Sequence, residues 1–174
     1  YTFTLLSNGT YVPPKGANLM LTKVTDHFVM QTFDGVRYTF TNWALNKNRI
    51  SKIEWPSTSG YGNGMVVNFT YGGTGPDFYL TQVSNNQPGS ARALNFTYDM
   101  LGGLIPYLKK VTADSSTTLY CNYTFDPALT GHLLSITDSN GSTTSYSYDS
   151  KHRLSGYQRP NLASFSVTYD DRDR

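Results

Sequence analysis

Cysteine is almost absent from the sequence, since Cys121 is the single cysteine among 174 residues. One cysteine cannot form an intrachain disulfide, and this excludes a small domain held together by disulfides. No base lies near Cys121 in the sequence, so we interpret it as a small apolar side chain rather than a catalytic thiolate.

Charge is scarce as well, because charged residues make up only 15% of the chain and the net charge is +2. This balance argues against a nucleic-acid-binding protein, which needs a concentrated basic face, and against a charge-rich disordered tail. Glu54 is the only glutamate, and alanine occurs seven times. Good helix formers are therefore rare, and the sequence is a poor candidate for a helical protein.

Long apolar runs are missing too, and none approaches the roughly 18 residues of a membrane-spanning helix. The first residues carry no initiator methionine, no basic segment and no cleavage pattern, so we do not interpret them as a signal peptide. The last residues stop inside a pattern that earlier parts of the chain continue. We therefore expect the chain to be an internal fragment or a processed product.

Small polar and aromatic residues fill the sequence instead. Ser, Thr and Asn together number 52, and aromatic residues reach 14%, with 14 Tyr and 9 Phe. Tyr, Phe, Thr and Val favour strands. Composition alone therefore predicts an all-β fold.

A short motif recurs along the chain: an aromatic residue, a small polar residue, a second aromatic residue and usually an aspartate. Clear or weakened copies lie at residues 96–99, 123–126, 146–149 and 167–170, and looser copies at 69–72, 38–41 and 1–4. From position 40 onward the second aromatic residues are 31, 27, 27, 23 and 21 residues apart. A turn and a second alternating run follow each motif, so each repeat predicts a β-hairpin.

The alternation inside each motif assigns its faces. Residues two apart in a strand point the same way, so Phe96 and Tyr98 share one face while Asn95 and Thr97 share the other. One hairpin cannot bury such a row of rings. We therefore predict repeated antiparallel β-hairpins that stack into a curved strip or partial shell, in the manner of a solenoid.

These motifs resemble the RHS or YD-repeat family. That family's pattern is Tyr-x-Tyr-Asp, two residues and Gly-Arg-Leu, and residues 146–154 match it closely, with His152 in the usual glycine position. The resemblance is good over residues 90–174 and weak over 28–89. We expect residues 1–27 to be a strand-rich segment before the repeats and residues 28–174 to be the repeats, cut in mid-repeat at the end.

The resemblance implies a hollow shell built from many hairpins. In bacterial polymorphic toxins and insecticidal toxin complexes such a shell encloses a toxic domain, and in teneurins a similar shell belongs to a surface adhesion protein. The partners it implies are the rest of a longer parent chain or other copies, and an encapsulated toxin domain or a cell-surface glycan. It also implies a secreted or cell-surface location and no cofactor. We expect the segment to be ordered only within such a parent or assembly.

The repeat itself defines a set of structural positions. We interpret each motif aspartate as an acceptor for turn amides, and we expect Arg153, and by position Arg174, to pair with an aspartate of a neighbouring repeat. The repeat-defining residues are Phe69, Tyr71, Phe96, Tyr98, Asp99, Tyr123, Phe125, Asp126, Tyr146, Tyr148, Asp149, Arg153, Leu154, Tyr169 and Asp170.

Catalytic and metal-binding patterns are lacking in the sequence. His27, His132 and His152 are dispersed, whereas a metal site needs converging ligands. There is no Gly-x-Ser-x-Gly, no phosphate-binding glycine loop and no His-Glu-x-x-His. The self-cleaving aspartyl site of the family also finds no match here. We therefore predict that the chain is not an enzyme and holds no metal.

Two kinds of candidate glycan site occur in the sequence, and each also has a simpler structural interpretation. Five Asn-x-Ser/Thr triplets occur, and three of them, at Asn68, Asn95 and Asn122, lie within the motif, the others being at positions 8 and 140. They would carry glycans on the polar face, but a chain so rich in Ser, Thr and Asn also produces such triplets by composition, which we favour. Exposed rings can bind sugars, and Trp43, Trp55 and Tyr61 are candidates, although capping or filling the strip is the simpler role.

Three functions remain open on the sequence. The first is a non-catalytic scaffold, the wall of an encapsulating shell or a subunit of an assembly. The second is an extracellular adhesin that binds carbohydrate or another protein. The third is a subunit of a β-rich surface filament, formed when the open edges of strips associate.

Overall fold

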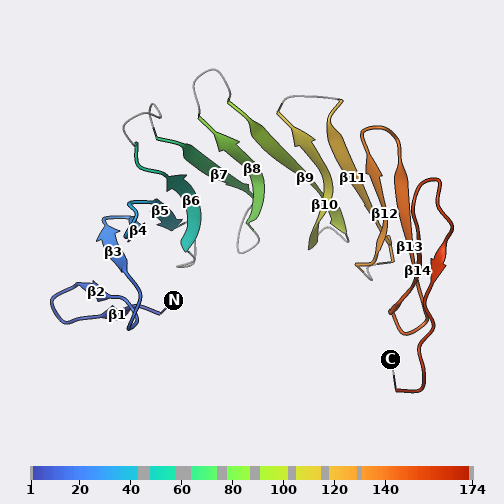
Figure 1. Cartoon of the computed structure of the whole chain (residues 1–174), viewed down its shortest axis with the longest axis horizontal. Helices are drawn as coiled ribbons and strands as arrows, with labels where there is room; N and C mark the ends of the chain where they lie inside the picture. The colour runs from blue at the N-terminus through green and yellow to red at the C-terminus, as the bar shows by residue number, and fades with distance from the viewer. Residues whose placement is uncertain are drawn as a thin grey trace. The chain divides into compact units, whose positions relative to one another are not determined.

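The structure is a computed structural model that describes residues 2–42, 48–57, 64–73, 78–86, 91–101, 105–114, 118–128 and 131–172. The chain divides into two compact units, residues 1–93 and 94–174. This division does not test the sequence boundary at residue 27, which stays a prediction. Each unit consists of β-strands joined by turns and loops (Figure 1).

Strands of six or seven residues make up most of the first unit, after two short ones. They are β1 (Thr4–Leu5), β2 (Tyr11–Val12), β3 (Leu19–Val24), β4 (His27–Thr32), β5 (Arg37–Asn42), β6 (Asn48–Glu54), β7 (Val66–Gly72) and β8 (Tyr79–Asn85). Each strand pairs antiparallel with the strands before and after it in this unit. The unit is thus a succession of hairpins laid side by side.

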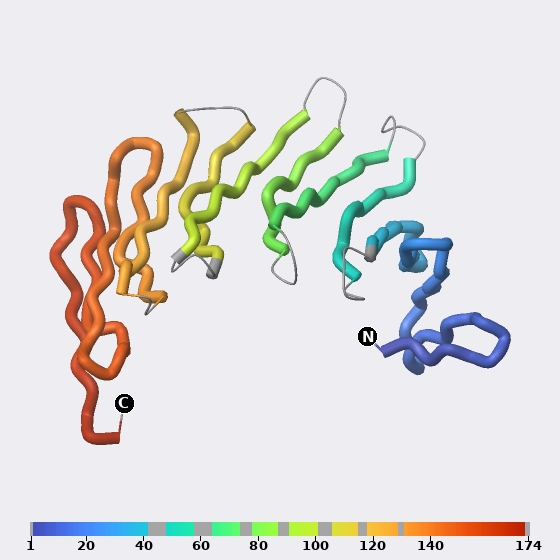
Figure 2. The backbone as a smooth tube through the Cα atoms, turned by 180° about the vertical axis from the view of Figure 1, so that it is seen from behind, coloured from blue at the N-terminus to red at the C-terminus, as the bar shows by residue number. Residues whose placement is uncertain are grey.

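The second unit has the same construction. Its strands are β9 (Ala93–Leu101), β10 (Ile105–Ala113), β11 (Tyr120–Phe125), β12 (Leu133–Asp138), β13 (Thr143–Tyr148), β14 (Leu154–Gln158) and β15 (Phe165–Ser166). Their antiparallel pairing again follows the order of the chain, and the backbone can be traced from hairpin to hairpin in Figure 2. The predicted all-β fold of stacked antiparallel hairpins is confirmed.

The described residues contain no helix long and apolar enough to cross a membrane.

The strand register places the aromatic residues on one face, as the alternation predicts. Tyr123 lies opposite Ile136 on β12, and Tyr146 lies opposite Tyr157 on β14. On the other face Thr137 pairs with Asn122 on one side and with Thr143 on the other. The two rows alternate along these paired stretches, so the second unit has one apolar face and one polar face.

The first unit follows the same rule. Phe28 lies opposite Phe40, and Phe69 lies opposite Val83. Asn68, on the polar face, pairs with Lys52 and with a serine of β8. The first unit, considered by itself, therefore also has an aromatic face and a polar face.

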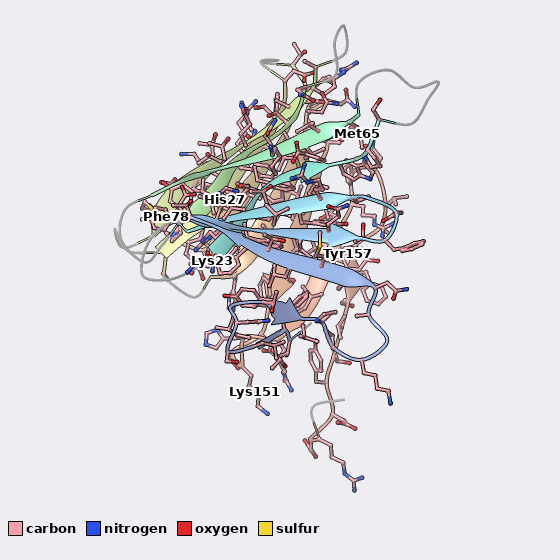
Figure 3. The ribbon with its side chains drawn as sticks, turned by 90° about the vertical axis from the view of Figure 1, so that its left-hand side faces the viewer. Lys23, His27, Met65, Phe78, Lys151 and Tyr157 are labelled. Carbon is pink, nitrogen blue, oxygen red and sulfur yellow. The ribbon has the colours of Figure 1, made fainter. Side chains whose placement is uncertain are left out.

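The described residues of neither unit form an enclosed core. Val36, with 6% of its surface exposed, is the one large apolar side chain buried among the described residues. Within each unit the strands pair in chain order into one single-layered sheet. Its side chains are drawn in Figure 3. Rings of the aromatic face are consequently half-buried by their neighbours along the sheet, and Phe165 keeps 53% of its surface exposed.

A β-bulge interrupts the pairing beside the motif in five of the described hairpins. In each one, an extra residue follows directly after the residue that pairs with the second aromatic of the motif. The extra residues are Ser51, Thr81, Lys109, Leu134 and Ser155. Bulges of this kind bend and twist a strand and re-aim its side chains. Composition could not reveal them, because residues as different as serine, threonine, lysine and leucine occupy this position.

Candidate functional site

The repeats contact one another through a residue that we call the coupling residue. It stands directly before the residue that pairs with the second aromatic of its own motif. Its side chain lies against the second aromatic of the following motif. The four contacts are Arg49 Cζ at 5.5 Å from the Tyr71 ring centroid, Tyr107 at 5.1 Å from Phe125, His132 at 4.2 Å from Tyr148, and Arg153 Cζ at 4.2 Å from Tyr169.

Tyrosine hydroxyls tie two of these contacts to the backbone. The Tyr148 hydroxyl donates a hydrogen bond of 3.0 Å to the carbonyl oxygen of Leu133, and the Tyr169 hydroxyl donates one of 2.7 Å to that of Leu154. Both acceptors are the pairing partners of the preceding motif's second aromatic. We call the coupling residue together with this tyrosine the joint between two repeats.

Asp149 organises the turn that leads into the last complete joint. Its Oδ1 accepts hydrogen bonds of 2.9 Å from the backbone N–H groups of Lys151 and Arg153. Its Oδ2 accepts a 2.7 Å hydrogen bond from Nε of Arg153, and this side-chain bond is the main cause that lowers the pKa of Asp149. Arg153 thus pairs with the aspartate of its own repeat, because the short turn places Asp149 and Arg153 four residues apart. The expected pair with an aspartate of a neighbouring repeat stays a prediction. Arg153 also lies over the Tyr169 ring of the next repeat.

The other motif aspartates also accept hydrogen bonds from nearby backbone amides. Asp126 accepts one from Ala128, and Asp170 accepts one from Arg172. Asp99 accepts one from the next residue and is 3.1 Å from Lys109 Nζ, which lowers the pKa of Asp99 chiefly through that side-chain hydrogen bond. The contacts of Asp126 and Asp170 agree with the interpretation of the motif aspartates as turn acceptors, whereas Asp99 lies within β9.

In two repeats the usual glycine position of the pattern has a left-handed backbone. His152 has φ of 66°, and Gly131, which precedes its coupling residue in the same way, has φ of 70°. Glycine reaches this region without steric cost, whereas most other residues do not. The departure from the family pattern at His152 is thus a side chain in a conformation that suits glycine.

Two histidines that are distant in sequence come together at one joint. The rings of His132 and His152 lie 5.0 Å apart, and His132 Nδ1 is 4.0 Å from Asp126 Oδ2. The spacing of the histidines in the sequence does not predict this pair, and only the repeat offset between the two turns could have revealed it. Across the residues that the structure describes, no group of three or more His, Cys, Asp or Glu side chains could hold a metal ion.

The remaining repeat-defining residues lie where their motif places them. Phe96, Tyr98 and Leu154 belong to the half-buried aromatic face. Cys121 is half-buried on the same face, and hydrogen bonding to its thiol raises the pKa of Tyr123.

The candidate glycan residues are spread over different environments. Asn68, Asn95 and Asn122 are half-buried on the polar face, and Nδ2 of Asn95 donates a 2.6 Å hydrogen bond to the Asp114 carbonyl. The triplets at positions 8 and 140 instead lie in exposed turns. Trp55 is half-buried, whereas Trp43, Tyr61 and Arg174 lie outside the described residues.

A chain of stacked hairpins, coupled by side chains at a fixed place in each repeat, is a β-hairpin repeat protein. Residues 129–161, which contain β12 to β14 and the His132 joint, match the family model described as RHS Repeat. This match confirms the RHS or YD-repeat assignment made from the sequence. The chain is thus a protein of repeated β-hairpins, and the part of it that matches the RHS family is residues 129–161.

Other comparisons add little. No curated protein sequence matches the chain. Among solved structures, a porin-like protein from Bacteroides uniformis is 13% identical with a TM-score of 0.44, over 95% of this chain and 84% of that one. A likeness this distant carries no argument about fold or function.

Proposed function

We propose that the chain is a non-catalytic structural segment of a secreted or surface RHS-type protein, and that it supplies wall to an enclosing shell or assembly. Its aromatic face lies toward a covered interior and its Thr, Ser and Asn rows lie toward solvent. The segment contributes shape and no chemistry of its own.

The observation that carries this proposal is the single layer with one apolar face. Val36 is the one large apolar side chain buried in the described residues, although aromatic residues are 14% of the chain. Rows of half-exposed rings are unfavourable in water, at about 25 cal/mol for each Å² of apolar surface left uncovered. A face of this kind needs a cover, and further repeats of a parent chain or other copies would provide one.

Light scattering and dye binding on the isolated 174-residue segment test this proposal. We expect the segment to self-associate and to bind the apolar dye anilinonaphthalene sulfonate through its aromatic face. A well-folded, soluble monomer that binds no dye would contradict the proposal.

A matched pair of variants on β15 locates the effect. Phe165 lies on the aromatic face opposite Tyr157 and is 53% exposed, while its neighbour Ser166 lies opposite Gly156 on the polar face. Phe165→Ser should reduce association and dye binding, and Ser166→Thr should leave both unchanged. Equal effects of the two variants would show that the aromatic face is not the surface that mediates association and dye binding.

Phe33 favours a second function, a binding module of an adhesin. This ring lies in the turn between β4 and β5, outside the aromatic face, and 91% of its surface is exposed. A large ring this exposed at a turn is the kind of side chain that stacks on sugars or fills a partner's pocket. Glycan-array binding that is lost in Phe33→Ala would support this function. If the chain binds no glycan on the array, the scaffold function is the one that remains.

A further inference from the structure

An exposed aromatic ring and an exposed methionine lie together at the open end of the β3–β4 hairpin in the first unit. Phe33 is 91% exposed and Met20 is 57% exposed. Both line a shallow hollow of about 500 Å³, together with Asn18, Gln31 and three neighbouring residues. This volume is in the range of small-ligand sites, and large apolar side chains left side by side in water mark a binding surface.

The strand register adds a side-chain amide next to each of these apolar side chains. Met20 pairs with Gln31 across β3 and β4, so their side chains share a face. Asn18 and Phe33 follow directly after the last residue pair of the two strands. The hollow is therefore bordered by two apolar side chains and two amides, and it lies outside the aromatic face.

The two amides have hydrogen-bonding capacity to spare. Within the described residues, neither the Asn18 nor the Gln31 side-chain amide hydrogen-bonds to another protein group. The Thr32 hydroxyl, by contrast, donates a 3.1 Å hydrogen bond to the carbonyl oxygen of Val36. Each amide offers a carbonyl oxygen as acceptor and two N–H donors. A ligand rich in hydroxyl groups can pair with both kinds of group.

Backbone hydrogen bonds hold the turn that carries Phe33. The Thr32 amide donates to the Val36 carbonyl oxygen over 2.9 Å, and the Gly35 amide donates to the Thr32 carbonyl oxygen over 3.0 Å. Gly35 has φ of 87°, a conformation that glycine adopts without steric cost. The ring is thus presented from a closed turn, so binding a ligand has little backbone left to order.

We propose that Asn18, Met20, Gln31 and Phe33 form a binding site for a neutral carbohydrate, and this site rests on the adhesin function proposed above for Phe33. The Phe33 ring stacks on the apolar face of a sugar ring, Met20 packs beside it, and the two amides hydrogen-bond to its hydroxyl groups. Adjacent strands are about 4.8 Å apart and residues two apart in a strand about 6.8 Å apart. The four side chains therefore border an area comparable with a single sugar ring.

Two other kinds of ligand fit the hollow less well. Among the described residues, no charged side chain lines it, and Arg37, which is opposite Gln31 on β5, is not part of its lining. An acidic sugar would therefore lack a charged partner here. A protein partner usually covers about 800 Å², whereas the apolar part of this surface consists of two side chains.

Methyl NMR on the whole 174-residue chain, with 13C-labelled methionine, tests the site. The probes are three neutral oligosaccharides, cellotetraose, mannotetraose and galactotetraose, with tetragalacturonate as the acidic control. We expect at least one neutral probe to shift the Met20 methyl signal. The Met30 signal should stay in place, because Met30 pairs with Leu21 on the aromatic face of the same hairpin.

Variants of Phe33 separate ring stacking from plain apolar contact. Phe33→Ala should weaken binding about tenfold, and Phe33→Trp should retain it. Phe33→Leu should lose binding as the alanine variant does, because leucine is apolar but has no ring. A leucine variant that binds as wild type does would overturn the stacking and point to a protein partner instead.

Alanine at the amide positions tests the hydrogen bonds. Gln31→Ala and Asn18→Ala should each weaken binding about threefold. Thr22→Ala is the matched control, since Thr22 lies two residues after Met20 on the same face but outside the hollow, and it should bind as wild type does.

Three results would overturn the site. They are no Met20 shift with any neutral probe, tighter binding of tetragalacturonate, and unchanged binding in both amide variants. If glycan-array binding needs Phe33 but neither amide, the adhesin function stands and this site does not. The scaffold function has its own test in light scattering, so it is judged separately from all of these results.

Discussion

Residues 1–93 and residues 94–174 contain the same kind of joint, although the motif is less complete in the first unit. In the second unit each motif ends in an aspartate, and Asp126, Asp149 and Asp170 accept hydrogen bonds from amides of the following turn. In the first unit the motif at Phe40 is followed by a threonine, and the one at Tyr71 by a glycine. Yet the bulge follows at Ser51 and Thr81, and Arg49 couples to Tyr71.

The difference teaches which parts of the repeat carry its geometry. Two aromatic residues, a bulge and a coupling residue occur with and without the aspartate. The aspartate is therefore a local stabiliser of the turn, while the bulge and the coupling residue connect one repeat to the next. Family motifs that emphasise Tyr-Asp describe the turn better than they describe the contact between repeats.

Removing the ring at a joint should have the largest effect. Tyr148→Ala should lower the free energy of unfolding by about 3 kcal/mol, because it removes the half-buried ring, its stacking on His132 and its hydrogen bond to Leu133. If the joints of the two units are of the same kind, Tyr71→Ala should lower the free energy of unfolding by a similar amount. Urea unfolding measures both.

Tyr148→Phe is the control, since it removes only the hydroxyl and should cost about 1 kcal/mol. A loss below about 1 kcal/mol for Tyr148→Ala would show that the ring does not hold the joint.

Two glycines offer a sharper comparison between the units. A methyl group on Gly156 would lie 2.8 Å from the carbonyl oxygen of Phe165, and one on Gly72 would lie 2.8 Å from the Thr81 methyl. The backbone of β15 cannot move without losing its pairing, whereas a side-chain methyl can turn away. Gly156→Ala should therefore cost about 2 kcal/mol and Gly72→Ala less than about 1 kcal/mol in thermal unfolding. Equal costs would contradict this account.

Exchange of arginine for lysine tests what the coupling residue needs. Arg49 donates a 2.7 Å hydrogen bond from Nη1 to the Phe78 carbonyl oxygen and lies beside two rings. Lysine keeps the charge but not the planar, forked group, so Arg49→Lys should cost about 1 kcal/mol. Arg153→Lys should cost about 0.5 kcal/mol, since it keeps an ion pair with Asp149 near the surface. Chemical unfolding that ranks the two variants in reverse would break the comparison.

Acid should weaken the two units through different partners. The pKa of Asp149 is lowered mainly by the Arg153 side chain, and that of Asp26 mainly by His27. A lowered pKa contributes stability above the ordinary value of 3.8, and this contribution is lost as pH falls through the lower folded value. Asp149→Asn should flatten the loss of stability below about pH 4.

In the acid titration, hydrogen exchange of β13 and β14 reports the second unit. The matched change Asp26→Asn should leave that region unaffected. An unchanged acid profile in Asp149→Asn would show that its ion pair is not formed in solution.

Much of the fold was predictable because it depends on a period of two. The alternation in residues such as Phe96 and Tyr98 determines the faces, and the recurrence of the motif determines the hairpins. Chain order then gives the strand order, since short turns join antiparallel neighbours. These features follow from local sequence alone.

The joints were not predictable in the same way. A bulge is a property of two strands together, and residues as different as Lys109 and Leu134 occupy it. The pairing of Arg153 with its own Asp149 depends on the tightness of a four-residue turn. Likewise, His132 comes just before β12 and His152 just before β14, and their rings lie near each other because the ends of these two hairpins are neighbours. Each contact depends on an offset between neighbouring hairpins that no single motif reveals.

The strictly sequential pairing of strands within each unit has a consequence for how fast the chain can fold. No strand of β1 to β8, or of β9 to β15, waits for a partner from a remote part of its unit, so each pairing closes only a short loop. All-β proteins usually fold slowly because they must bring distant segments together. Here the order of assembly can follow the order of synthesis, one hairpin after another. We therefore expect folding rates closer to those of proteins with local contacts than to those of β-sandwiches.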